Sequence, residues 1–127
     1  QVLNLSTCGL GDLGAEILAK AVARNISLRR LGLDANQIGS VGAEHLAGLL
    51  MEGDGALQEL SLNKNRIGDD GAAAFAAALQ ENTSLRSLEL RACGVHDAGL
   101  QALAQAMEMN NNLATLSLWG NHFEVGS

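Results

Sequence analysis

Three histidines, His45, His96 and His122, are the side chains of this 127-residue sequence best suited to acid–base or metal chemistry. Such roles require a carboxylate or a thiol close to the histidine. No carboxylate or thiol recurs from repeat to repeat of the sequence in the register of these histidines. The paired Asp69-Asp70 has the position of a helix start, and no G-x-x-x-x-G-K-[ST], G-x-S-x-G or C-x-x-C motif is present. We therefore expect solvated histidines, no metal, no cofactor, no small-molecule substrate and no enzymatic activity.

Composition narrows the class of partner. The net charge of −6 argues against nucleic acid or an anionic membrane, because both are bound through basic surfaces. No apolar run approaches the ~20 residues that a membrane-spanning helix needs. The remaining class of partner is another protein.

The clearest feature of the sequence is an internal repeat. The pattern L-x-x-L-x-L-x-x-(N/C)-x-(L/I/V) recurs, and its N/C position falls at Cys8, Asn36, Asn65, Cys93 and Asn121. The intervals are 28, 29, 28 and 28 residues. This periodicity predicts one domain of about four and a half repeats, over residues 1–27, 28–56, 57–84, 85–112 and 113–127, as part of a longer array.

Each copy of the pattern continues as a predicted helix of about three turns, with apolar residues at i, i+3, i+4 and i+7. These stripes are Ala15-Leu18-Ala19-Val22, Ala43-Leu46-Ala47-Leu50, Ala72-Phe75-Ala76-Leu79 and Leu100-Leu103-Ala104-Met107. Residues that accept hydrogen bonds from helix N–H groups precede them, at Asp12, Ser40, Asp69 and Asp97. Residues that tolerate a left-handed conformation follow them, at Asn25, Gly53, Asn82 and Asn110.

Alternating strands and helices at this period predict an α/β solenoid. Parallel strands lie ~4.8 Å apart, whereas packed helices need roughly 8–10 Å. The stack should therefore curve into a horseshoe, with the parallel sheet on the concave face and the helices on the convex face.

The segment Asn65-Arg66-Ile67-Gly68-Asp69-Asp70-Gly71-Ala72, together with the 28–29-residue period, resembles leucine-rich repeats of the ribonuclease-inhibitor type. The resemblance extends over essentially the whole chain. Repeats of this type occur in the sensor regions of NOD-like receptors and in Ran GTPase-activating protein. The resemblance implies a protein-binding or ligand-sensing module, with regulation of a small GTPase as the alternative.

Two observations bear on the cellular compartment. Cys8 and Cys93 lie three repeats apart, so ~14 Å of sheet separates thiols that could bridge only within ~7 Å. We expect both thiols to be reduced and buried, which suits the cytoplasm. Three N-x-S sequons, at Asn4, Asn25 and Asn82, are compatible with secretion; we interpret Asn25 and Asn82 as helix ends instead.

The candidate binding surface consists of the variable strand positions that alternate with the core leucines and point into the concave face. The residues selected there are Arg30, Asp34, Glu59, Asn63, Glu89, Arg91 and Trp119. Trp119 occupies a position that is polar in the other repeats, whereas Phe75 and Phe123 replace aliphatic core residues. A tryptophan beside an arginine is typical of a binding hot spot, although packing on a further repeat is an alternative role for Trp119.

Overall fold

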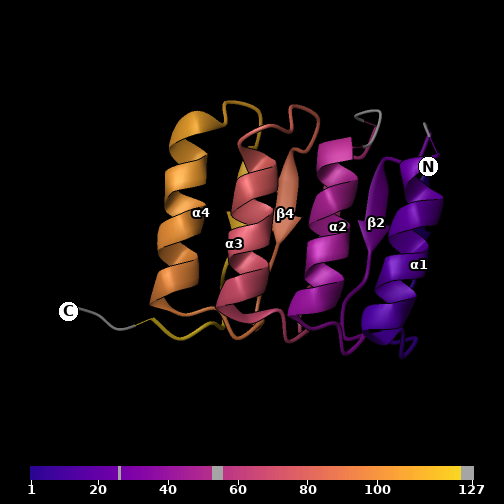
Figure 1. Ribbon diagram of the computed structural model, residues 1–127, viewed down its shortest axis with the longest axis horizontal. Coiled ribbons are helices and arrows are strands. Elements are labelled where there is room, and N and C mark those ends of the chain that lie inside the picture. The colour runs from indigo at the N-terminus through magenta and orange to yellow at the C-terminus, as the bar shows by residue number, and fades with distance from the viewer. Residues whose placement is uncertain (26, 53–55, 124–127) are drawn as a thin grey trace.

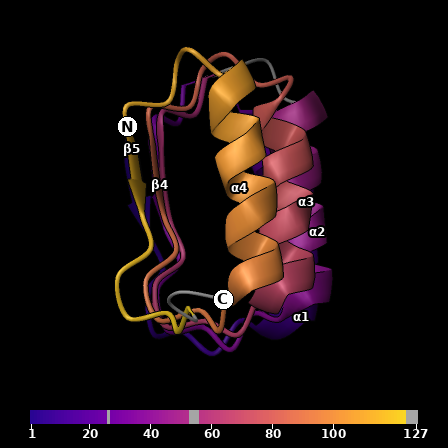
Figure 2. The same ribbon diagram turned by 90° about the vertical axis from the view of Figure 1, so that its left-hand side faces the viewer.

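In the computed structural model, which describes residues 1–25, 27–52 and 56–123, strands and helices alternate along the chain. The strands are β1 (Val2–Asn4), β2 (Arg30–Gly32), β3 (Glu59–Ser61), β4 (Ser87–Glu89) and β5 (Thr115–Ser117). The helices are α1 (Gly11–Ala23), α2 (Ser40–Glu52), α3 (Gly68–Leu79) and α4 (Asp97–Met109). Figures 1 and 2 show the helices side by side in one layer and the strands in a second layer behind them. The predicted α/β solenoid is confirmed.

The strands form one parallel sheet in the order β1-β2-β3-β4-β5. Each repeat places the same position opposite its counterpart, so that Leu31 pairs with Leu3 on one side and with Leu60 on the other. A constant repeat length produces this register, because each turn of the solenoid returns the chain to the same place one strand further along.

The core lies between the two layers and is built mainly from the leucines of the repeat. In the central repeats Leu33, Leu62 and Leu90 are fully buried. Phe75 is also fully buried in α3, and Phe123 is partly buried against the same core, as the sequence predicts.

In the central repeats the N/C position, Asn36, Asn65 or Cys93, is buried and bonds to the loop backbone. Asn65 accepts a hydrogen bond at Oδ1 from the Asn36 amide (2.9 Å) and donates from Nδ2 to the Leu33 carbonyl (2.9 Å). Cys93 substitutes for asparagine by donating from Sγ to the Leu62 carbonyl (3.0 Å). Burial of this position therefore leaves polar backbone groups satisfied between the repeats.

Two of the four predicted acceptors at the helix starts, Asp12 and Asp69, act between repeats. Asp12 Oδ1 accepts from the amides of Gly39 (2.7 Å) and Gly42 (3.0 Å), at the start of α2 rather than of its own helix. Asp69 Oδ1 likewise accepts from Gly99 (3.0 Å) in α4. A Cβ at Gly42 or Gly99 would lie 2.7 or 2.6 Å from that carboxylate oxygen, so glycine is needed for the close approach.

The prediction of left-handed asparagines at the helix ends is wrong. Asn110 has φ −100° and ψ 120°, and the other helix-end asparagines also lack positive φ values. The side chain ends the helix instead, because Asn110 Oδ1 accepts from the Leu113 amide (2.8 Å) while Nδ2 donates to Leu79 of the preceding repeat (2.6 Å). Asn82 makes the corresponding bonds. Gly53, the fourth predicted helix end, lies outside the described residues.

Two further expectations fail at the ends of the stack. Cys93 is buried, as predicted, but Cys8 is exposed. Cys8 belongs to the repeat of β1, which is an edge strand, so no preceding repeat covers it in the described structure. Ala104 is exposed rather than part of the apolar stripe of α4, where Leu103 and Ala106 are buried. No further helix packs against α4 among the described residues.

Candidate partner-binding face

The outward side chains of the strands, and of the residue two positions after each strand, form one continuous surface, which we call the sheet face. All the residues selected from the sequence lie on it: Arg30, Asp34, Glu59, Asn63, Glu89, Arg91 and Trp119. The burial patterns of β2, β3 and β4 each have a fully buried central leucine between two more accessible neighbours. The alternation predicted for the strands is therefore confirmed.

An ion pair occupies the beginning of the strands. Arg30 and Glu59 are register partners on β2 and β3, and the Arg30 Nε atom contacts Glu59 Oε2. Their side chains are 64% and 44% exposed. An exposed pair of this kind adds at most ~1 kcal/mol to stability, so both groups remain accessible to a partner.

The carboxylate of Asp34 is held by the next repeat. Its Oδ1 atom accepts from the Ser61 hydroxyl (2.5 Å) and from the Asn63 backbone amide (2.9 Å). The Asn63 side-chain amide adds a longer contact to Oδ2 (3.5 Å). Asp34 is thus committed to bonds within the sheet face.

The same relation recurs along the sheet face. The Ser6 hydroxyl accepts from the Asp34 amide (3.1 Å), Asp34 accepts from the Asn63 amide, and Asn63 Oδ1 accepts from the Arg91 amide (2.8 Å). We call this series the sheet-face ladder. It fixes the side-chain positions before any partner arrives, which lowers the ordering cost of binding.

Arg91 and Trp119 form the far end of this surface. Arg91 Nη2 lies 3.5 Å from Glu89 Oε1, and the Arg91 side chain is still 49% exposed. Trp119 is 81% exposed, the largest exposure among the big apolar side chains described. The two residues occupy equivalent positions in neighbouring repeats, as predicted.

A shallow groove of about 420 Å³ crosses the repeats next to this pair. It is lined by Ser6, Thr7, Asp34, Ala35, Asn63, Lys64, Arg91, Ala92 and Trp119. Thr7, Ala35, Lys64 and Ala92 all have positive φ, between 52° and 62°. Each of these residues directly follows a residue of the sheet face, so the chain turns sharply at the same point in four successive repeats.

Comparison with known families identifies the repeat. The Leucine Rich repeat family matches residues 1–19, 24–47, 57–76 and 81–104, more than half of the chain. The chain belongs to the leucine-rich-repeat family. A solved structure entitled "Leiomodin-1 Actin-Binding Site 2 (ABS2)" is similar, with 20% identity and a TM-score of 0.83. The alignment covers 98% of this chain and 71% of that one. The comparison with curated proteins gave no match.

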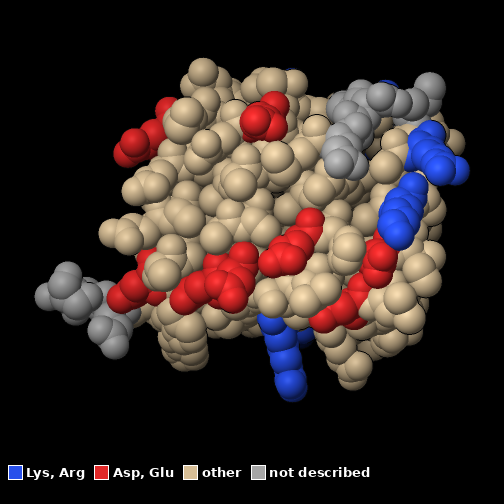
Figure 3. All heavy atoms as spheres, in the orientation of Figure 1, with Lys and Arg blue, Asp and Glu red and all other residues tan. Residues whose placement is uncertain are grey.

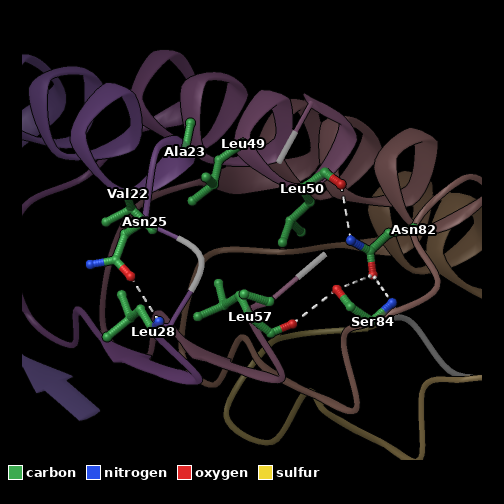
Figure 4. Close-up of a pocket in the computed structure, with 10 residues that line it drawn as sticks. Val22, Ala23, Asn25, Leu28, Leu49, Leu50, Leu57, Asn82 and Ser84 are labelled. Atoms are coloured by element: carbon green, nitrogen blue, oxygen red, sulfur yellow. Dashed lines mark hydrogen bonds between the residues drawn. The ribbon is translucent and has the colours of Figure 1, made fainter. Parts of the chain in front are cut away.

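A small pocket at the helix ends of this leucine-rich-repeat chain offers no alternative binding site. The cavity shown in Figure 4 has a volume of about 20 Å³, room for roughly one water molecule. Val22, Leu28 and Leu57 point into it, and the hydrogen bonds of Asn25 and Asn82 border it. It is a packing defect at the helix ends, too small for an organic ligand.

The histidines lie outside the sheet-face groove. His45 Nε2 is 3.8 Å from Glu16 Oε1 on the helices, where the hydrogen bond and charge of Lys20, followed by the charge of His45, lower the pKa of Glu16. His96 Nδ1 contacts the His122 carbonyl oxygen (2.9 Å). In the described part of the chain, no three histidine, cysteine or acidic side chains gather as a metal site.

Most of the charged side chains visible on the helix side are acidic. Figure 3 shows acidic side chains in a band across the helices, with basic side chains mainly beside α1.

No helix in the described ranges is long and apolar enough to span a membrane.

Two residues outside the set selected from the sequence, Ser61 and Lys64, contribute to the candidate site. Ser61 was only a variable position in the strand pattern, although its hydroxyl bonds Asp34. Lys64 lies one residue beyond the positions selected from the sequence, although it lines the groove together with Trp119. The repeat pattern could have identified Lys64, because it directly precedes Asn65 at the N/C position and therefore lies at the turn after the strand.

Proposed function

We propose that this leucine-rich-repeat chain is a non-enzymatic module that binds another protein through its sheet face, as a scaffold or as a ligand-sensing unit. The observation that carries the proposal is the 81% exposure of Trp119 at the end of an ordered polar surface. Tryptophan and arginine dominate binding hot spots, since both provide large contact areas with directional bonds. The Arg91–Trp119 pair is the centre of the proposed site.

The surrounding surface supports this assignment. The groove is shallow and its central residues are held by the sheet-face ladder. Such a surface suits a protein segment better than a small molecule, which binds in a deep, mainly apolar pocket. Arg30, Glu59 and Lys64 offer charges for orienting the partner.

The compartment that fits this proposal is the cytoplasm. Both cysteines are free thiols, and free thiols persist in reducing compartments. Of the sequon asparagines, Asn82 is buried and its amide nitrogen donates to the Leu50 carbonyl (2.9 Å), which supports a structural role. We also propose that the repeats are of the ribonuclease-inhibitor type, as in the sensor regions of NOD-like receptors.

A pair of matched double variants tests the site. Arg91→Ala with Trp119→Ala should weaken partner binding by at least ~2 kcal/mol and leave thermal stability nearly unchanged. Lys20→Ala with Gln105→Ala, on the helices, is the control and should change affinity by less than ~0.5 kcal/mol. Actin is the first partner to measure, because the leiomodin-1 title names an actin-binding site.

A photo-crosslinking amino acid extends the test to an unidentified partner. Placed at exposed Thr115 on the sheet face, it should capture a partner from cell extract that the same group at exposed Gln105 on α4 does not. Capture at Gln105 alone, or full binding by the Arg91 and Trp119 double variant, would refute sheet-face binding. Stimulated GTP hydrolysis by a small GTPase, insensitive to that double variant, would favour the GTPase-regulator alternative.

A further inference from the structure

The sheet-face ladder ends at Arg91, and the reason is chemical. Ser6, Asp34 and Asn63 each offer a side-chain oxygen to the backbone N–H of the next repeat. Arg91 holds the same position, but a guanidinium group has only donors and no acceptor. The backbone N–H of Trp119, the next residue of the series, therefore has no acceptor on the Arg91 side chain.

The donors that meet Asp34 are repeated two strands further along the sheet. Asp34 accepts from the Ser61 hydroxyl and the Asn63 amide, which belong to the adjacent repeat. Ser117 follows Ser61 and Glu89 in the strand register, and Trp119 follows Ser117 by two residues, as Asn63 follows Ser61. The Ser117 hydroxyl and the Trp119 amide thus reproduce the donor pair.

This second donor pair lacks its carboxylate. Within residues 1–25, 27–52 and 56–123, neither the Ser117 hydroxyl nor the Trp119 amide donates to a protein acceptor. The strand remains in register, because the Trp119 carbonyl accepts from the Ala92 amide (2.9 Å) and the Ser117 carbonyl from Leu90 (2.8 Å). These two donors belong to the repeat next to that of Arg91, whose partner Glu89 is the register neighbour of Ser117.

We propose that a carboxylate of the bound protein occupies this place, accepting from Ser117 and Trp119 and pairing with Arg91. The inference rests on the proposed function and adds the chemistry of the partner: an acidic residue or a free C-terminus, next to a group that packs on the Trp119 ring. The chain itself supplies the precedent, since the Asp34 carboxylate meets the same two donor types.

The charges nearby are compatible with an anionic partner. Glu89 contacts Arg91 at one oxygen (3.5 Å), and the five N–H donors of a guanidinium group can serve two carboxylates. Lys64 adds a second cation in the groove. The acidic band across the helices repels the same partner from the opposite side of the molecule.

Blocked tripeptides provide a direct probe. Acetyl-Ala-Asp-Ala-amide carries one side-chain carboxylate, its Asn counterpart carries none, and acetyl-Ala-Asn-Ala with a free C-terminus carries only a terminal one.

Trp119 is the single tryptophan and the chain has no tyrosine, so tryptophan fluorescence reports on this site alone. Backbone amide NMR shifts of Trp119 confirm the location. The Asp peptide should bind about tenfold more tightly than its Asn counterpart, as expected for charge-assisted hydrogen bonds. The free C-terminus tests the second source of a carboxylate.

Two substitutions at Arg91 distinguish the effect of its positive charge from the effect of filling the acceptor position. Arg91→Ala removes the cation and leaves both donors free, whereas Arg91→Asn removes the cation and provides the acceptor that Asn63 provides one repeat earlier. Arg91→Asn should therefore abolish the preference for the Asp peptide, slow hydrogen exchange of the Trp119 amide and raise the urea midpoint above that of Arg91→Ala. Arg91→Ala should retain a weakened preference.

Ser117→Ala should weaken binding of the Asp peptide by about threefold, the loss of one hydrogen bond, while Thr83→Ala, at an exposed loop position after α3, should have no effect. Equal binding of the Asp and Asn peptides, no response to any peptide at tens of millimolar, or equal binding by Arg91→Asn and Arg91→Ala would overturn the carboxylate site. Crosslinking of the partner at Thr115 would then still support sheet-face binding, so failure of this inference is distinguishable from failure of the proposed function.

Discussion

The carboxylate of Asp69 allows the coupling between repeats to be measured directly. It lies in the first turn of α3, yet its Oδ1 atom accepts from the backbone amides of His96 (2.7 Å) and Gly99 (3.0 Å) at the start of α4. Asp70, its neighbour in the same turn, is exposed. Replacing each aspartate by alanine removes the same charge from the same helix end, so the difference between the variants isolates the bonds to the next repeat.

The magnitude follows from the burial of the two donors. The His96 residue is exposed, so water can replace the carboxylate at its amide, whereas Gly99 is buried and its N–H loses its partner. An unsatisfied buried donor costs about 1–3 kcal/mol. Loss of the favourable charge at the α3 N-terminus costs a further ~0.3–1 kcal/mol in both variants. We expect Asp69→Ala to lower the free energy of unfolding by about 2–3 kcal/mol and Asp70→Ala by less than ~1 kcal/mol.

Urea denaturation measures the two losses, and amide hydrogen exchange shows where they occur. For Asp69→Ala, protection should decrease at His96 and Gly99, 27 and 30 residues away in sequence, and not in the first turn of α3. Equal destabilisation by Asp69→Ala and Asp70→Ala, or loss of protection confined to α3, would show that the aspartate caps its own helix and would refute the coupling.

Two further sets of measurements test the core and the thiols. Leu62→Ala should lower the free energy of unfolding by about 2–5 kcal/mol, because Leu62 is fully buried; Ser87→Ala should stay within ~0.5 kcal/mol, and similar urea midpoints would contradict the strand alternation. A small thiol reagent should modify exposed Cys8 quickly and buried Cys93 only after denaturation. Burial raises the pKa of Cys93 from 9.0 to about 11, so its contribution to stability is complete below pH 9 and is lost as the pH rises through about 11. Cys93→Ser should remove that part of the alkaline decline; an unchanged decline would assign it to other groups.

Much of the fold follows from the sequence because each repeat determines its own phase. A strand alternates with period two and a helix with period 3.6, so spacing alone places Leu62 inside and Trp119 outside. The constant interval of 28 or 29 residues then requires neighbouring copies to pair in register, as Leu31 does with Leu60. These outcomes depend on local geometry repeated several times.

Tertiary structure decides the contacts that cross from one repeat to the next. Composition identifies Asp69 as a hydrogen-bond acceptor, but only the stacking distance brings it to α4 instead of α3. The asparagine at position 110 ends its helix without a left-handed turn, because the preceding repeat supplies the Leu79 carbonyl. Exposure of Cys8 likewise depends on which neighbour packs against it, and no pattern within the repeat contains that information.

The candidate site also depends partly on the sequence and partly on the tertiary structure. Strand alternation places Arg91 and Trp119 on the sheet face from the sequence alone. The donors of Ser117 and Trp119 become recognisable only in three dimensions, by comparison with Ser61 and Asn63 on the Asp34 carboxylate. Hydrogen bonds depend on distances and angles between separate repeats, whereas periodicity specifies only which side of the sheet each residue occupies.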